Sequence, residues 1–173
     1  MKPPSPPRWA FIALGANQGN PREQIRAAMD RLQAFSSEAV RTSSLWQSEP
    51  VDCPPGSPPF VNAIVGLVPL PDETPETLLR KLQVLEQEFG RCPKQVPNEP
   101  RPLDLDLIAF GDERRRKKQL CLPHPRAHLR AFVLAPLSEI APDLILPGQR
   151  KPARQLLAQL TSDEWIQRLD GEA

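Results

Sequence analysis

Residues 101–110, RPLDLDLIAF, place Asp104 and Asp106 two positions apart inside an otherwise apolar run. With the two-residue period of a β-strand, both carboxylates share one face and the intervening leucines share the other. Aspartate is unfavourable in strands, and like charges side by side raise the folding free energy. The run therefore predicts a strand buried on one face. On its other face the strand carries one of two things. The aspartates are either the exposed charges that keep an edge strand from pairing with another chain, or a carboxylate pair that holds a cation.

The hydrophobic pattern around this strand predicts the order β-α-β-β-α-β. Apolar runs predict strands over residues 9–17, 39–48 and 60–68, and amphipathic periodicity predicts helices over residues 20–35 and 74–89. Asn20 and Thr74 each precede a proline, so both are candidate helix caps. The fold class is therefore α+β and ferredoxin-like, an antiparallel four-stranded sheet with two helices on one face. From about Arg126 we expect a helical, irregular C-terminal extension packed around this core.

Composition limits the domain count and the compartment. A chain of 173 residues predicts one domain, over residues 9–173, preceded by a disordered Pro-rich tail over residues 1–8. The three cysteines are odd in number and lack CxxC spacing, so reduced thiols without a metal are expected. No signal-peptide or membrane-length apolar run occurs, and we expect a cytoplasmic protein that binds no membrane.

The charge pattern limits the partners. A net charge of +1 gives no general attraction to nucleic acid, and we expect a monomer that binds small molecules. The basic run ERRRKK, residues 113–118, is either the solvated tip of a hairpin or a patch that attracts a phosphorylated ligand.

The aspartate pair lies next to cationic residues. Arg91, Lys94 and Arg101 precede it in a loop, and a magnesium–polyphosphate site needs carboxylates for the metal and arginines for phosphate oxygens. The alternative is a set of surface ion pairs, such as Arg101 with Asp104, worth less than about 1 kcal/mol each.

His124 and His128 are the two histidines of the chain, in the stretch PHPRAHLR. They could share a metal at helical spacing, although no HExxH pattern is present. With Arg126 and Arg130 nearby, a phosphate-contacting or hydrogen-bonding role for His124 is better supported. An ordinary surface histidine is the remaining alternative.

Several other positions are ambiguous from sequence alone. Phe60 and Asn62 share one face of a predicted strand, where they could sandwich and hydrogen-bond a flat heterocycle, or Phe60 could belong to the core. Gln83 and Glu86 lie off the apolar stripe of their helix and could simply be exposed. Gly15, in LGANQGN, indicates a tight turn rather than a complete nucleotide-binding loop.

Five segments together resemble one family. PRPLDLDLIAFG is similar to the signature stretch of the 6-hydroxymethyl-7,8-dihydropterin pyrophosphokinase family. IALGANQGN, SSLWQSEPV, PFVNAIVGL and LPHPRAHLRAFVLAPLSEIAP resemble further segments of that family in the same order, over roughly residues 9–165. The resemblance implies transfer of diphosphate from ATP to the hydroxymethyl oxygen of the pterin, with release of AMP, in folate biosynthesis.

The resemblance also implies the catalytic and ATP-binding residues. Asp104 and Asp106 would hold two magnesium ions, and Arg91 and Arg101 would contact phosphate. The remaining ATP contacts are expected at Gln83, Glu86, Leu107, Cys121, His124 and Arg130.

The pterin-binding residues follow in the same way. They are expected at Gly15, Ser48, Val51, Phe60, Asn62 and Phe132. Phe60 and Phe132 would stack on the two faces of the ring, and Asn62 would bind its edge with help from backbone groups near Ser48 and Val51.

One loop departs from the family pattern. In CPKQVPNEPR, Pro93 and Pro97 stand where the family often has arginine, and Glu99 replaces a small residue. We expect weaker phosphate binding and a stiffer loop. A catalytically impaired relative that serves as a binding or partner subunit is therefore an alternative. An RNA-recognition domain would have the same element order, but the chain lacks tyrosine and an RNP1-like segment.

Overall fold

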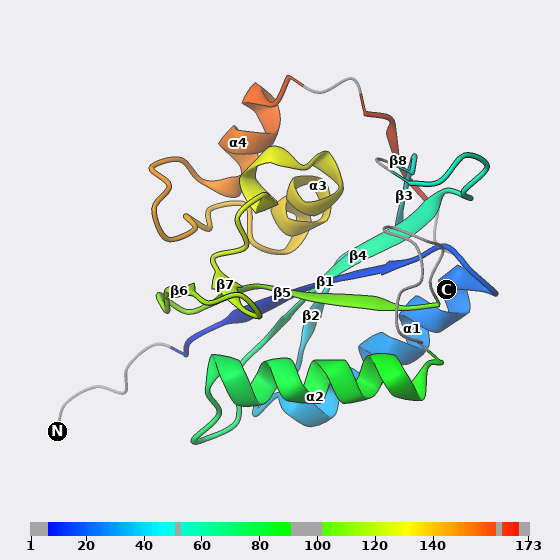
Figure 1. Cartoon of the computed structure of the whole chain (residues 1–173). Helices are drawn as coiled ribbons and strands as arrows, with labels where there is room; N and C mark the ends of the chain where they lie inside the picture. The colour runs from blue at the N-terminus through cyan, green and yellow to red at the C-terminus, as the bar shows by residue number, and fades with distance from the viewer. Residues whose placement is uncertain (1–6, 51–52, 91–101, 162–163, 170–173) are drawn as a thin grey trace, which may run out of the picture.

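A six-stranded antiparallel sheet forms the centre of the computed structural model, which describes residues 7–50, 53–90, 102–161 and 164–169 (Figure 1). The hydrogen-bonded order is β5-β1-β4-β3-β8, and β2 also pairs with β4. The strands are β1 (Ala10–Ala16), β2 (Arg41–Thr42), β3 (Trp46–Ser48), β4 (Phe60–Leu67), β5 (Asp104–Phe110) and β8 (Ile166–Arg168). The predicted fold class and the order of the four predicted strands are confirmed.

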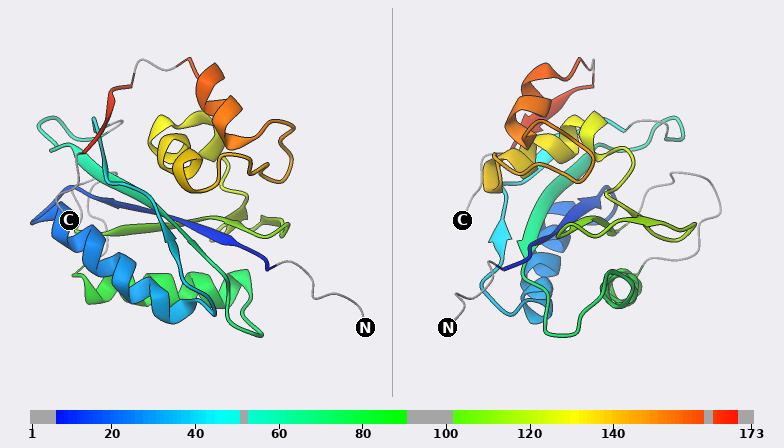
Figure 2. Two further views of the ribbon diagram at one scale, coloured as in Figure 1. Left: turned by 180° about the vertical axis from the view of Figure 1, so that it is seen from behind. Right: turned by 90° about the vertical axis from the view of Figure 1, so that its left-hand side faces the viewer.

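Helices cover both faces of the sheet (Figures 1 and 2). On one face lie α1 (Pro21–Leu32) and α2 (Pro75–Glu88), as predicted, and on the other lie α3 (Ala131–Ile140) and α4 (Ala153–Gln159). Short 3-10 turns occur as η1 (Gln33–Phe35) and η2 (Ala127–Leu129). None of the helices in the described ranges is long and apolar enough to cross a membrane.

The two predicted helix starts differ in their capping. Thr74 caps α2, because its side chain accepts a hydrogen bond from the Thr77 backbone N–H. The Thr77 side chain in turn accepts a hydrogen bond from the Thr74 backbone N–H, which completes a capping box. The Asn20 side chain makes no capping hydrogen bond in α1. Instead, the Asn20 backbone N–H donates to Gln24 Oε1 at 2.7 Å, so the capping prediction was wrong for Asn20.

Strand alternation separates two apolar clusters. Residues such as Ile12, Val65 and Leu105 point toward α1 and α2, whereas Phe11 and Ile64 point toward α3. Burial of apolar area on both faces stabilises the sheet at about 25 cal/mol per Å². The α3 side changes character along the strands, from apolar at Phe11 to polar at the other end, and this polar end forms the site described below.

A β-bulge in β5 positions the aspartate pair. Phe11 of β1 lies opposite Ala109, but Ile12 lies opposite Leu107, so Ile108 is the extra residue. Ile108 and Ala109 consequently both belong to the α3-side cluster. Beyond the bulge the alternation resumes, and Asp104 and Asp106 share the α3 face while the neighbouring leucines face the helices.

The single strand predicted over residues 39–48 is wrong, because it is split into β2 and β3. At the break, Ser43 Oγ accepts a hydrogen bond from the Ile64 backbone N–H at 2.9 Å. Glu139 of α3 accepts hydrogen bonds from the Ser44 backbone N–H, at 3.2 Å, and from Ser44 Oγ, at 2.8 Å. The Ser43 N–H still donates to the Ile64 carbonyl at 3.0 Å, and side chains bind the other backbone groups at this point.

The C-terminal region is the expected helical extension, with one strand that was not predicted. Besides α3 and α4 it contains β8, which pairs with the outer side of β3. The predicted hairpin around the basic run is present, with β6 (Arg115–Arg116) paired to β7 (Cys121–Leu122). Of the predicted N-terminal tail, residues 1–6 lie outside the described residues, whereas Arg8 lies 5.4 Å from the centre of the Phe110 ring.

Candidate active site

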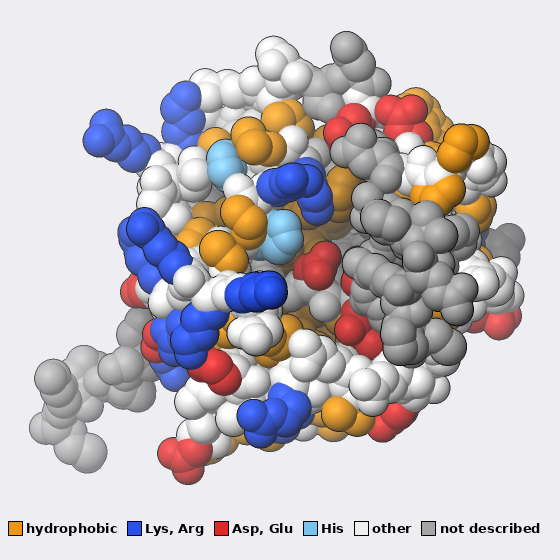
Figure 3. All heavy atoms as spheres, in the orientation of Figure 1, with side chains coloured by type: hydrophobic (Ala, Val, Ile, Leu, Met, Phe, Trp, Pro, Cys, Tyr) orange, Lys and Arg blue, Asp and Glu red, His pale blue; other side chains and the backbone are white. Residues whose placement is uncertain are grey.

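A cavity of about 180 Å³ opens between the polar end of the sheet and the start of α3. Its walls come from β1, β3, β4 and β5, from the segment that leads into α3, and from the residues before β8. Figure 3 shows acidic side chains next to histidine and basic side chains around a hollow in this face. Charged and apolar groups thus line one cavity.

The cavity floor is a row of residues that strand register brings together. Gly15 lies opposite Asn62 on one side and opposite Asp104 on the other. A Cβ at Gly15 would lie 3.6 Å from Asn62 Oδ1 and 3.8 Å from the Phe60 ring, so a side chain there would fill the floor. Since neighbouring strands are about 4.8 Å apart, Asp104 and Asn62 are separated by about 10 Å of open floor.

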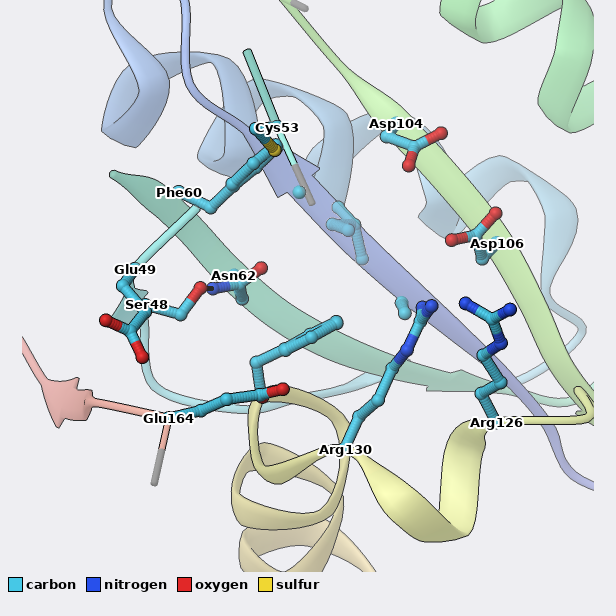
Figure 4. Close-up of a pocket in the computed structure, with 14 residues that line it drawn as sticks. Ser48, Glu49, Cys53, Phe60, Asn62, Asp104, Asp106, Arg126, Arg130 and Glu164 are labelled. Carbon is cyan, nitrogen blue, oxygen red and sulfur yellow. Dashed lines mark hydrogen bonds between the residues drawn. The ribbon is translucent and has the colours of Figure 1, made fainter. Parts of the chain in front are cut away.

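Asp104 and Asp106 form the acidic wall. Both carboxylates point into the cavity, and the guanidinium groups of Arg126 and Arg130 extend toward them from the opposite wall (Figure 4). Arg130 also lies 5.3 Å from the centre of the Phe132 ring, within the range of a cation–π contact. Cationic and anionic groups therefore face each other across the same space.

The donor set of this wall suits magnesium. Among the described residues there is no group of three or more histidine, cysteine or carboxylate side chains that could enclose a metal. Magnesium does not need such a cage, because it commonly binds one or two carboxylates and takes its remaining oxygens from water and phosphate. Asp104 and Asp106 provide that arrangement, with two hard oxygen donors open to a cavity.

His124, two positions before Arg126, is not among the residues that line the cavity, and a backbone hydrogen bond fixes its ring in a neutral tautomer. Its backbone N–H donates to the Ile108 carbonyl at 2.9 Å, and its Nδ1 accepts a hydrogen bond from the Arg126 backbone N–H at 3.2 Å. Burial, followed by the charges of Arg130 and Arg126, lowers the pKa of His124 below its ordinary value, while Asp104 acts in the opposite direction. With Nδ1 accepting, Nε2 carries the proton and can donate to an anion.

The aromatic side of the cavity, formed by Phe60, Asn62 and Phe132, suits a flat heterocycle. Phe60 of β4 and Phe132 of α3 both line the cavity. Asn62 is 5% exposed, and its Nδ2 donates to Ser48 Oγ at 2.7 Å. This hydrogen bond fixes the amide orientation, so that Oδ1 faces the floor above Gly15 as an acceptor.

Besides Ala13 and Leu14 of β1, four residues with polar or charged side chains line the cavity and were not among the predicted site residues. They are Glu49, Cys53, Arg126 and Glu164. Arg126 had a sequence signal, because it lies two positions from His124. Glu164 had none, since only the pairing of β8 with β3 brings the C-terminal segment to this end of the sheet.

Some predicted ATP contacts lie away from the cavity lining. Gln83 is exposed on α2 and Cys121 is exposed on β7, whereas Leu107 is 4% exposed in the core between sheet and helices. Glu86 is 8% exposed and accepts a hydrogen bond from the Leu105 backbone N–H at 2.9 Å. The alternative of plain exposure is therefore wrong for Glu86. The remaining predicted residues, Val51, Arg91 and Arg101, lie outside the described residues.

A second hollow, of about 620 Å³, lies elsewhere on the α3 side, between Trp9, Phe11 and the segment after α3. The Arg41 guanidinium lies 4.2 Å from the centre of the Trp9 ring at its edge. None of the predicted site residues that the structure describes lines this hollow.

The fold and the cavity together define an α+β protein in which a carboxylate pair, two arginines and an aromatic wall face a common ligand space. The chain belongs to the 7,8-dihydro-6-hydroxymethylpterin-pyrophosphokinase (HPPK) family, whose sequence profile matches residues 11–142. This membership confirms the resemblance seen in the sequence.

Individual relatives agree with the family match. The chain is 40% identical over 163 residues to a 2-amino-4-hydroxy-6-hydroxymethyldihydropteridine pyrophosphokinase of Pseudomonas aeruginosa, covering 93% of this chain and 96% of the relative. It is 36% identical over 130 residues to a folate synthesis bifunctional protein of Arabidopsis thaliana, covering 75% of this chain and 26% of that longer protein. The chain is thus a pyrophosphokinase of folate synthesis.

A solved structure supports the fold. The HPPK-DHPS triple mutant of Plasmodium falciparum, crystallised with pteroate, superposes with a TM-score of 0.68 at 12% identity, over 89% of this chain and 43% of the longer one. At that identity the likeness concerns the fold alone, and it agrees with the ferredoxin-like sheet.

Proposed function

We propose that the chain transfers diphosphate from ATP to the hydroxymethyl group of 6-hydroxymethyl-7,8-dihydropterin, releases AMP, and requires magnesium at Asp104 and Asp106. The single observation that carries this proposal is the polarity of the cavity. Carboxylates and arginines occupy one end, and the Phe60–Asn62 wall occupies the other, about 10 Å away across the floor. The cavity therefore has separate places for a polyphosphate and for a flat heterocycle.

The pterin site orients the nucleophile. The ring stacks between Phe60 and Phe132, and Asn62 Oδ1 accepts a hydrogen bond from its edge. This placement directs the hydroxymethyl group toward Asp104. Its oxygen attacks the β-phosphorus of ATP and loses its proton to water. The bond from that phosphorus to the oxygen bridging the α- and β-phosphates breaks, and AMP leaves with that oxygen.

Catalysis in this scheme depends on position and charge rather than on a covalent intermediate. Arg126 and Arg130 donate hydrogen bonds to phosphate oxygens across from the carboxylates, and His124 adds a neutral N–H donor. Magnesium, when bound, neutralises the charge that develops on the transferred group. Asp104 and Asp106 would hold it, in line with the two ions expected from the family resemblance.

The proposal extends to the working form of the protein. We expect it to act as a monomer in the cytoplasm. Light scattering at assay concentration would test the oligomeric state.

AMP release from ATP and magnesium, measured with and without 6-hydroxymethyl-7,8-dihydropterin, tests the reaction. AMP formation that requires the pterin supports the proposal. If folded protein releases no AMP under these conditions, the proposal fails and the impaired binding or partner subunit becomes the better explanation. The loop 91–100, on which that alternative rests, lies outside the described residues.

A further inference from the structure

The second hollow, of about 620 Å³, has no part in the proposed transfer. It lies on the same face of the sheet as the candidate active site but at the other end of β1, where Trp9 and Phe11 line it, whereas Gly15 lines the active-site cavity. None of the described residues lines both spaces. A ligand beside Trp9 would therefore occupy a place separate from ATP and pterin.

Strand register leaves the floor of this hollow open. Phe11 of β1 lies opposite Gly66 of β4, and Gly66 lies opposite Arg41 of β2. A Cβ at Gly66 would lie 3.1 Å from the Phe11 ring and 3.5 Å from the Trp9 ring, so the absence of a side chain lets both rings pack close to the strand. The two rings form an apolar floor.

Backbone hydrogen bonds fix both sides of the hollow. On one side, the Gly111 N–H donates to the Trp9 carbonyl at 2.9 Å. On the other, the segment after α3 is tied to α4, because the Ala153 N–H donates to the Leu144 carbonyl at 2.8 Å. Ile145 of this segment lines the hollow and is 52% exposed. A preformed and largely apolar hollow is typical of small-molecule sites.

Arg41 supplies a cation at the edge of the hollow. Its guanidinium lies 4.2 Å from the centre of the Trp9 ring, and no carboxylate in the described part of the chain forms a salt bridge with it. Stacking on the ring orients the planar guanidinium, whose N–H groups remain available for a carboxylate. The β2 side of the hollow thus presents a positive charge next to an apolar floor.

The other charged residues that line the hollow are paired or distant from that cation. Arg8 Nη1 lies 3.6 Å from Glu113 Oε1, and Arg154 Nε lies 3.0 Å from Asp143 Oδ1. Asp112 follows β5, which is separated from β2 by β1 and β4, a span of about 14 Å. The guanidinium on β2 therefore sets the charge at its own end of the hollow.

We propose that this hollow binds a small amphipathic carboxylate, an aryl or alkyl acid whose apolar body covers Phe11 and Ile145 and whose carboxylate accepts hydrogen bonds from Arg41. Apolar burial supplies most of the affinity, since an ion pair with an exposed arginine contributes little. The inference does not rest on the proposed function, because it uses none of the residues assigned to ATP or pterin.

Two probes of nearly equal shape provide the test, 2-naphthaleneacetate and its uncharged analogue 2-naphthaleneacetamide. Binding is followed by the indole N–H signals in the NMR spectrum of the full chain labelled with nitrogen-15, and Trp9→Phe identifies the signal of Trp9. Both probes should shift this signal. Wild-type protein should bind the carboxylate about fivefold more tightly than the amide, the upper range for a solvent-exposed ion pair.

Three variants separate the parts of the proposed site. Arg41→Gln should abolish the preference for the carboxylate and leave the affinity for the amide unchanged. Ile145→Ser, at an exposed position, should weaken the binding of both probes by about threefold, because it removes apolar contact. The matched control Arg80→Gln removes the same charge from an exposed position of α2, on the opposite face of the sheet, and should bind both probes as the wild type does.

The inference is overturned if neither probe shifts the Trp9 signal, or if Arg41→Gln keeps the preference for the carboxylate. A Trp9 signal that shifts with protein concentration alone would also overturn it, because the hollow would then be an interface between copies of the chain. None of these measurements involves AMP formation, so a negative result would leave the proposed function intact.

Discussion

A buried carboxylate on α2 supports the outer edge of β5 between the two aspartates, which makes Glu86 a sharp test of how the acidic wall is supported. Among the described residues β5 is the end strand of the sheet, and groups outside the sheet bind its backbone: the His124 N–H donates to the Ile108 carbonyl at 2.9 Å. Glu86 of α2 accepts the Leu105 N–H at 2.9 Å, between the two aspartates, and is only 8% exposed. A buried N–H that loses its partner destabilises a protein.

The expected magnitude follows from that contact. Hydrogen bonds to charged groups contribute about 1.5–3 kcal/mol, so Glu86→Ala should lower the free energy of unfolding by about 2 kcal/mol. For a chain of this size, this corresponds to a decrease in Tm of about 4–8 °C. Glu86→Gln keeps an acceptor oxygen for Leu105 and should lose less than about 1 kcal/mol.

Urea denaturation followed by circular dichroism measures these changes, with Gln83→Ala as the control. Gln83 is exposed one turn earlier on the same helix and should stay within about 0.5 kcal/mol of wild type. AMP formation should fall in Glu86→Ala, because the strand between Asp104 and Asp106 loses its support. If Glu86→Ala is as stable as Gln83→Ala and only the KM for ATP rises, the carboxylate contacts the nucleotide and our structural assignment is wrong.

Three further predictions concern the cavity. Asp106→Ala should reduce magnesium-dependent AMP formation by more than about a hundredfold without lowering the urea midpoint, and unchanged turnover would refute the metal assignment. Arg126→Ala should raise the KM for ATP by about tenfold and leave that for pterin unchanged, whereas the exposed Arg154→Ala should do neither. Because the folded-state pKa of His124 is lowered, its contribution to stability is complete above pH 6.5 and is lost as the pH falls below that value. The urea midpoint of His124→Gln should therefore decrease less than that of wild type between pH 7.5 and 5.5, and equal decreases would contradict this.

Local pattern was enough for much of the fold. Alternation in residues 101–110 correctly placed Asp104 and Asp106 on one face, because a strand's side chains alternate whatever packs against it. Periodicity and a proline after Thr74 located α2. The family segments brought Phe60, Asn62 and Phe132 together before their positions in space were known, and all three line the cavity.

Only the tertiary structure determined which distant segments complete the site. The break between β2 and β3 depends on Glu139, which lies far along the chain on α3. The sequence left Glu86 either exposed or in contact with ATP, whereas in the structure it accepts the Leu105 N–H at the outer edge of β5. Glu164 reaches the cavity because β8 pairs with β3, and no short-range pattern encodes a pairing between segments so far apart. The sequence by itself determined the strand faces and the chemistry of the principal residues, whereas long-range contacts decided their surroundings, since hydrogen-bond partners and burial arise only when the chain is folded.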